Sequence, residues 1–115
     1  MIPSWNMSGV LPPLPLGAKG HEVNRSPYIV DMPNLIDKFA TSPARIQIIR
    51  GLLNYRKALY DIGITDGFQW IDGSFMEDIE HVEGRDPNDV DVVTFIALPE
   101  GTSQEILFSE NPQLF

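Results

Sequence analysis

Prolines crowd the first third of this 115-residue chain. Six of its ten prolines stand between positions 3 and 33, with three glycines among them. Because proline lacks a backbone N–H and fixes φ, this stretch can form neither a regular helix nor a central strand. We therefore expect an extended arm over residues 1–32 and one core domain over residues 33–115. The arm is more apolar than a disordered tail, so we expect it to pack either on its own domain or on a partner protein; its apolar residues are Trp5, Val10, Leu11, Leu14 and Leu16.

Composition excludes several classes of protein. The chain has no cysteine, which excludes disulfides, zinc–thiolate sites, iron–sulfur clusters and thiol catalysis. Sixteen acidic and eight basic side chains give a formal net charge of −8, which argues against an extended nucleic-acid-binding surface. The first residues lack a signal-peptide pattern, and no apolar run approaches the roughly 20 residues that span a bilayer. We expect a cytoplasmic protein without a membrane span, and a homo-oligomer is compatible with the sequence.

The pattern after residue 41 predicts a long helix. Ser42 can cap it, Pro43 suits its first position, and Gly63 suits its end. One face carries an apolar row, and we expect the opposite face to be a solvated basic strip. The apolar row is Ile46, Ile49, Leu53 and Tyr60, widened by Ile48, Leu52, Tyr55 and Leu59, and the basic strip is Arg45, Arg50, Arg56 and Lys57. Two shorter helices are expected, one at residues 33–39 and one near residues 102–108, the latter capped by Thr102 with Glu105 completing a capping box.

Two segments have the period of strands. Residues 67–72 alternate large apolar and polar side chains, and residues 90–96 are rich in β-branched and aromatic residues. We expect an antiparallel pair joined by a long, acidic, polar connection over residues 73–88. Phe68 and Trp70 are expected to be core or interface aromatics rather than a platform on which bases stack. The fold class is therefore α+β, with a packed helix on a mixed β-sheet.

Candidate chemistry gathers where these two segments approach each other. Asp89 and Asp91 stand at the start of the second strand, and residues two apart in a strand point the same way, about 6–7 Å apart. Two such carboxylates can hold Mg²⁺ together with substrate phosphates. Gly73 and Ser74 follow the first strand, where a glycine allows backbone N–H groups and a hydroxyl to approach a triphosphate closely.

At these residues the sequence resembles the nucleotidyltransferase superfamily, which shares its palm-like core with polymerase beta. The signature of that family is a Gly-Ser after a strand and an Asp-x-Asp at the head of the next, matched here by Gly73-Ser74 and Asp89-Val90-Asp91. The resemblance covers roughly residues 42–98. It implies that Asp89 and Asp91 are catalytic and hold Mg²⁺ on a nucleoside triphosphate, and that Gly73 and Ser74 contact its phosphates. Small members often belong to toxin–antitoxin or phage-defence systems.

The sequence departs from that family's pattern in three ways: the gap between Ser74 and Asp89 is longer, no second glycine follows shortly after Gly73-Ser74, and the third carboxylate is not evident. A third carboxylate is expected from a later strand, and only Glu100 and Glu105 are candidates here. Arg85, in the connection between the strands, is a further candidate for contacting a phosphate. Two functions stay open at this point. The chain is a nucleotidyltransferase, or an inactive descendant, that acts on a protein or nucleic-acid hydroxyl; alternatively, it is an acidic, non-enzymatic inhibitor or assembly subunit that binds a partner protein through its arm.

Overall fold

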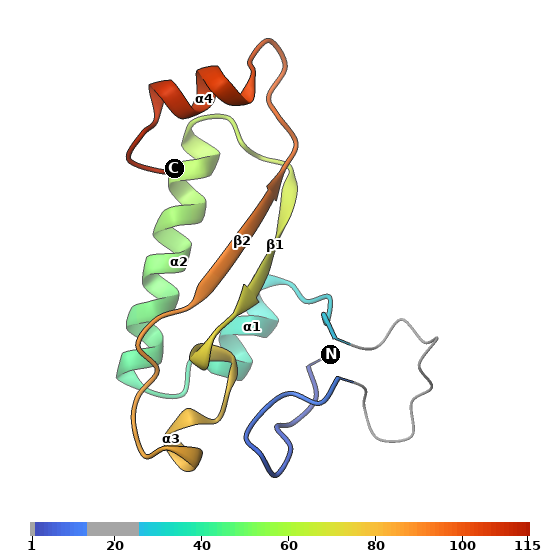
Figure 1. Cartoon of the computed structure of the whole chain (residues 1–115), viewed down its shortest axis with the longest axis vertical. Coiled ribbons are helices and arrows are strands. Elements are labelled where there is room, and N and C mark those ends of the chain that lie inside the picture. The colour runs from blue at the N-terminus through green and yellow to red at the C-terminus, as the bar shows by residue number, and fades with distance from the viewer. Residues whose placement is uncertain (1, 14–25) are drawn as a thin grey trace.

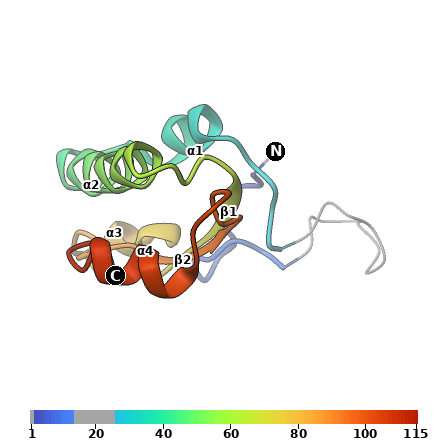
Figure 2. The same cartoon turned by 90° about the horizontal axis from the view of Figure 1, so that it is seen from above.

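The fold is α+β, with two helices packed on one face of an antiparallel strand pair (Figures 1 and 2). The computed structural model describes residues 2–13 and 26–115, so the predictions made for Leu14 and Leu16 lie outside the described residues. Within this part the elements follow in order: α1 (Met32–Phe39), α2 (Pro43–Asp61), β1 (Gly67–Asp72), the 3₁₀ turn η1 (Ser74–Met76), α3 (Ile79–Val82), β2 (Asp91–Ile96) and α4 (Gln104–Glu110).

The sheet is smaller than the expected mixed sheet. β1 pairs with β2 antiparallel, with Gly67 opposite Ile96 at one end and Asp72 opposite Asp91 at the other. Among the described residues the sheet contains these two strands alone, so the expected mixture of parallel and antiparallel pairs is not found. The connection between the strands is also not simply polar, because η1 and α3 lie in it and bury Phe75 and Ile79.

The termini of the helices follow from their caps. The side chain of Ser42 accepts a hydrogen bond from the Arg45 backbone N–H at 3.2 Å, which confirms the predicted start of α2. The predicted cap of α4 is wrong by one residue. Ser103, rather than Thr102, caps this helix, because its hydroxyl accepts from the Ile106 backbone N–H at 3.2 Å.

The core has two parts, one at each end of α2. The larger part joins α1, α2 and η1, and Trp5, Leu11, Ile71 and Val92 pack against it from the N-terminal segment and the strands. The smaller part joins the last turns of α2 to α4. The buried members of the larger part are Leu35, Phe39, Ile49, Leu52 and Phe75, and those of the smaller part are Leu59, Ile64 and Leu107.

The described N-terminal residues lie on this core. The Trp5 indole packs against Phe39 with ring centroids 5.9 Å apart, and its Nε1 donates to the Met76 carbonyl at 2.8 Å. The Gly9 carbonyl accepts from the Asp78 backbone N–H at 2.7 Å. Trp5 and Leu11 therefore pack on their own domain, whereas Met7 is exposed.

The prediction for the faces of α2 was wrong in two respects. Ile46, Leu53 and Tyr60, from the expected apolar row, are exposed. Arg45, placed by the pattern on a solvated strip, is fully buried. The face that packs inward is rotated around the helix because it must bring Arg45 to its partners on the β1–β2 connection.

Five groups surround the Arg45 guanidinium. It binds the Glu80 carboxylate through two nitrogens, with Nε–Oε2 at 2.7 Å and Nη2–Oε1 at 2.9 Å. It also donates to the carbonyls of Phe75 and Glu77, both at 2.6 Å. Its carbon lies 5.5 Å from the Trp5 ring and 5.4 Å from the Phe75 ring. A buried charge is tolerated only when its hydrogen bonds are satisfied in this way. The contact fixes the connection to the first turns of α2.

Replacing Arg45 by alanine will destabilise the fold by about 3–5 kcal/mol, because the buried Phe75 carbonyl, the partly buried Glu77 carbonyl and Glu80 lose their donor. The matched control is Arg50→Ala on the exposed side of the same helix, which we expect to change stability by less than about 0.5 kcal/mol. Urea unfolding followed by circular dichroism measures both variants. Equal effects of the two substitutions would show that the buried contact contributes nothing specific.

The same ion pair makes stability depend on pH. The hydrogen bond from Arg45 holds the pKa of Glu80 below its ordinary value of 4.5. A carboxyl whose pKa is lowered by folding stabilises the fold above its unfolded pKa, and this contribution is lost as the pH falls through the folded value. The difference in urea midpoint between the wild type and Glu80→Gln should therefore be largest near pH 6 and shrink below pH 4.5. A difference that stays constant down to pH 3 would contradict this, and Glu110→Gln serves as the exposed control.

Candidate functional site

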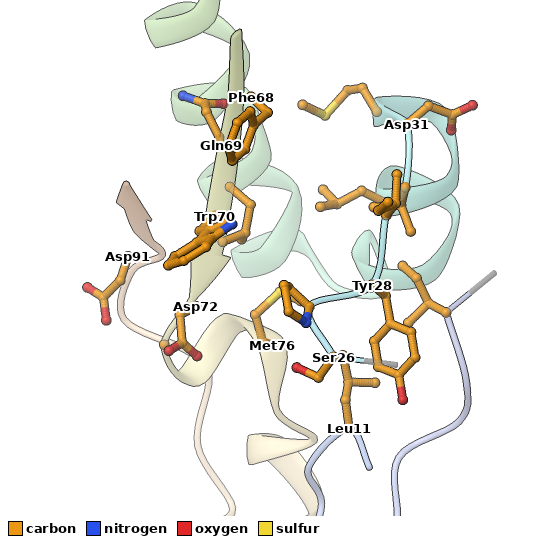
Figure 3. A pocket seen from close by; sticks show the side chains of 18 of the residues that line it. Leu11, Ser26, Tyr28, Asp31, Phe68, Gln69, Trp70, Asp72, Met76 and Asp91 are labelled. Carbon is orange, nitrogen blue, oxygen red and sulfur yellow. The ribbon is translucent and has the colours of Figure 1, made fainter. Parts of the chain in front are cut away.

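The register of the strand pair places two carboxylates side by side. Asp72 is the last residue of β1, Asp91 is the first residue of β2, and they are direct cross-strand partners. Residues opposite each other in an antiparallel pair have Cα atoms about 4.5–5.5 Å apart and side chains on the same face. Figure 3 shows both side chains on one side of β1. The pair has the number and kind of ligands that Mg²⁺ uses together with phosphates.

Gly73 turns the chain beside this pair. Its φ of +93° and ψ of −175° lie in a region that is open almost only to glycine. A Cβ atom built at this position would lie 3.0 Å from Oδ2 of Asp91 and 3.4 Å from its backbone nitrogen. The absence of a side chain therefore lets the backbone after β1 pass directly against the Asp91 carboxylate. Ser74 follows as the first residue of η1.

These residues line one cleft of about 1,100 Å³, which runs along β1. Asp72, Gly73, Ser74 and Asp91 lie at one end of its wall. Its other wall includes residues 26–32, where the Tyr28 hydroxyl donates to the Pro12 carbonyl. Burial raises the pKa of Tyr28 above 10, so this phenol stays protonated as a donor at neutral pH. Among the described residues of the lining, Arg56 is the one lysine or arginine, and its Nη1 donates to the Gln69 side chain at 3.1 Å.

The other predicted site residues lie elsewhere. Asp89 stands in the loop before β2, because the strand begins at Asp91 rather than at Val90, and its side chain is exposed. Arg85 lies beyond α3, where its Nη2 contacts Glu83 Oε2 at 3.3 Å and its Nη1 donates to the Asp86 carbonyl. Glu100 and Glu105 stand in the turn after β2 and in the first turn of α4. The structure places none of these four residues on the lining of the cleft.

Asp72 is the site residue that sequence reasoning missed. It directly precedes Gly73 and Ser74, so the residue itself was in view as part of that motif. The missing information was the register of the strand pair. The two antiparallel strands overlap over their full length, and this register places the last residue of β1 beside the first residue of β2. In the part of the chain that the structure describes, no three histidine, aspartate or glutamate side chains form a ready metal cluster. The site thus offers a carboxylate pair rather than a complete ligand set.

The fold and the cleft define a small α+β domain whose candidate site lies at the end of a two-stranded sheet. The chain belongs to a family of unknown function, DUF6932, whose model matches residues 3–115. No curated protein and no solved structure matches it. Across residues 2–13 and 26–115, no helix is long and apolar enough to cross a membrane.

The geometry at Gly73 predicts that alanine will destabilise the fold more at this glycine than at another glycine with positive φ. Gly73→Ala adds a methyl group against Asp91 in a glycine-only region, and we expect a loss of about 1–3 kcal/mol. Gly84→Ala is the matched control, because Gly84 has φ +65° and a Cβ there meets no atom within 4 Å. It should cost only about 1 kcal/mol from backbone strain. Urea denaturation measures the free energy of unfolding of both variants. Equal losses would contradict the argument that a glycine is required at position 73 because the backbone there passes close to Asp91.

Proposed function

We propose that this protein is a Mg²⁺-dependent nucleotidyltransferase of the kind the sequence resembles, transferring a nucleotide from a nucleoside triphosphate to a hydroxyl on a protein or nucleic acid. The observation that carries the proposal is the register that pairs Asp72 with Asp91 beside the Gly73 turn. This adds a carboxylate from across the sheet to the Asp89-x-Asp91 motif. Asp91 is central, with Asp89 two residues away along the chain and Asp72 opposite.

The residues have distinct roles in this mechanism. Asp91 and Asp72 would hold the metal, and Asp89 is the further ligand that the resemblance assigns. Magnesium, when bound, supplies positive charge to the phosphates and to the oxygens that attack and leave. The Gly73 backbone and the Ser74 hydroxyl would contact the triphosphate at the end of β1. Arg85 would need a rearrangement of its loop to reach that end, because it now pairs with Glu83.

The reaction is an in-line displacement at the α-phosphorus. The acceptor hydroxyl oxygen forms the new bond to phosphorus, the bond to the bridging oxygen of the β-phosphate breaks, and pyrophosphate leaves. The proton of the hydroxyl passes to a carboxylate or to water. Because Arg56 is the one cation on the described lining, metal ions must neutralise most of the triphosphate charge, and nucleotide binding should depend strongly on Mg²⁺.

Calorimetric titration with nucleoside triphosphates tests the proposal. The wild type should bind them with Mg²⁺ and not with EDTA, and Asp91→Asn should weaken binding at least tenfold without unfolding the protein. Asp72→Asn should weaken it as well, which separates the cross-strand pair from the motif alone. Asp37→Asn, at an exposed position on α1, is the matched control and should bind normally. Metal-dependent binding that is unchanged in Asp91→Asn would contradict the proposal.

A non-enzymatic role in binding a partner protein is the second candidate. It is favoured by Met7 and Ile29 in the arm, which are 104% and 91% exposed although apolar. Trp5 and Leu11, by contrast, pack on the core, so removing residues 1–20 would disturb the fold as well as any interface. A wild type that binds no triphosphate would favour this role.

A further inference from the structure

The face of the strand pair that carries the carboxylates also carries exposed aromatic rings. Strand alternation and the observed register place Phe68, Trp70 and Asp72 of β1 on one face with Phe95, Val93 and Asp91 of β2. Phe68 and Trp70 are 59% and 51% exposed, so they are not core aromatics, and the alternative that they belong to an interface stays a prediction. The opposite face carries Ile71 and Val92, which pack against the larger core. The aromatic face is therefore a surface available to a ligand.

The rings on this face contact one another and form one aromatic cluster, called the platform below. Phe68 and Phe95 are stacked, with centroids 4.7 Å apart and planes 17° apart. Trp70 meets Phe95 edge to face, with centroids 5.0 Å apart. Contacts between neighbours hold the rings in place, so a flat ligand could stack on them with little loss of side-chain entropy. An indole in such a position provides the kind of surface on which nucleobases stack.

The platform and the carboxylate pair lie at a defined spacing. Trp70 precedes Asp72 by two residues on the same strand, which places it about 6.5–7 Å further along the same face. The sugar of a nucleotide separates its base from its phosphates by a comparable length. Trp70 also lines the same cleft as Asp72 and Asp91 (Figure 3). One nucleotide can therefore reach both features at once.

Charge favours a single nucleotide over the other occupants of an apolar face. A second copy would bring two chains of net charge −8 together with their aspartates on the shared face. A nucleic-acid strand needs cations along its path, and the described linings beside this face have two, Arg56 bonded to Gln69 and Lys57 paired with Asp61. A nucleoside triphosphate needs neutralisation at one point only, and that point is the carboxylate pair with its metal.

We propose that the face formed by Trp70, Phe95 and Phe68 is the base-binding site of the nucleotide whose phosphates are held at Asp72 and Asp91. This inference rests on the proposed function for the position of the phosphates. It makes Trp70 a binding residue that the nucleotidyltransferase motif does not include, and it makes the site selective for ligands that carry an aromatic base.

Calorimetry with Mg²⁺–ATP and with Mg²⁺–tripolyphosphate, which lacks the base, tests this proposal. Trp70→Ala should weaken Mg²⁺–ATP binding about 5- to 150-fold and leave Mg²⁺–tripolyphosphate within twofold of the wild type. Trp70→Phe keeps a ring and should retain most of the affinity. Phe115→Ala removes an aromatic ring that is 47% exposed and lines no described cleft beside the strand pair, and it should change the binding of neither ligand.

The outcomes separate this inference from the proposed function. If Trp70→Ala binds Mg²⁺–ATP like the wild type, or weakens both ligands equally, the base-binding site is overturned while the metal site stands. If the wild type binds ATP in a Trp70-dependent way but does not bind tripolyphosphate, the metal site fails and the platform stands. A wild type that binds neither ligand overturns both. Tighter, Trp70-dependent binding of a thymidine hexanucleotide would identify a nucleic-acid strand as the occupant and overturn the single-nucleotide proposal.

Discussion

The buried Arg45 guanidinium is the contact on which the arrangement of the candidate site depends. The connection between the strands is acidic and has little regular structure, so it would not adopt one position by itself. Arg45 satisfies two of its carbonyls and the Glu80 carboxylate, and the Trp5 and Phe75 rings cover the charge. Because an unpaired charge in this place would be very costly, the first turns of α2, the N-terminal segment and the connection are held to one geometry. The segment held in this way begins directly after Gly73.

The two faces of the strand pair have different roles. One face packs on the helices and supplies part of the core, whereas the other presents a carboxylate pair at one end and aromatic rings along its length. A two-stranded sheet is only marginally stable by itself, so the helical layer behind it carries the stability. This division leaves the outer face free for a ligand. It also explains why Phe68 and Trp70, which the sequence predicted to be core or interface aromatics, are exposed.

Local signals in the sequence were enough to predict most elements. Ser42 and Pro43 gave the start of α2, alternation gave β1 over residues 67–72, and both segments were correctly expected to pair antiparallel. The errors arose where the environment outweighed the local pattern. Periodicity placed Arg45 among solvated cations, since nothing near it in the sequence reveals partners 30 to 35 residues away. The start of α4 was misplaced because Thr102 and Ser103 are both good caps.

The sequence by itself determined the absence of thiol chemistry, the acidic charge, the α+β class and the Gly73-Ser74 and Asp89-x-Asp91 motifs, because these follow from residue types and short-range spacing. The tertiary structure decided that Asp72 is the partner of Asp91, that the aromatic residues of β1 face outward, and that Arg45 is buried. Each of these depends on register or on long-range packing. A shift of one residue in the register would move every side chain of a strand to the other face, and no local pattern reports it.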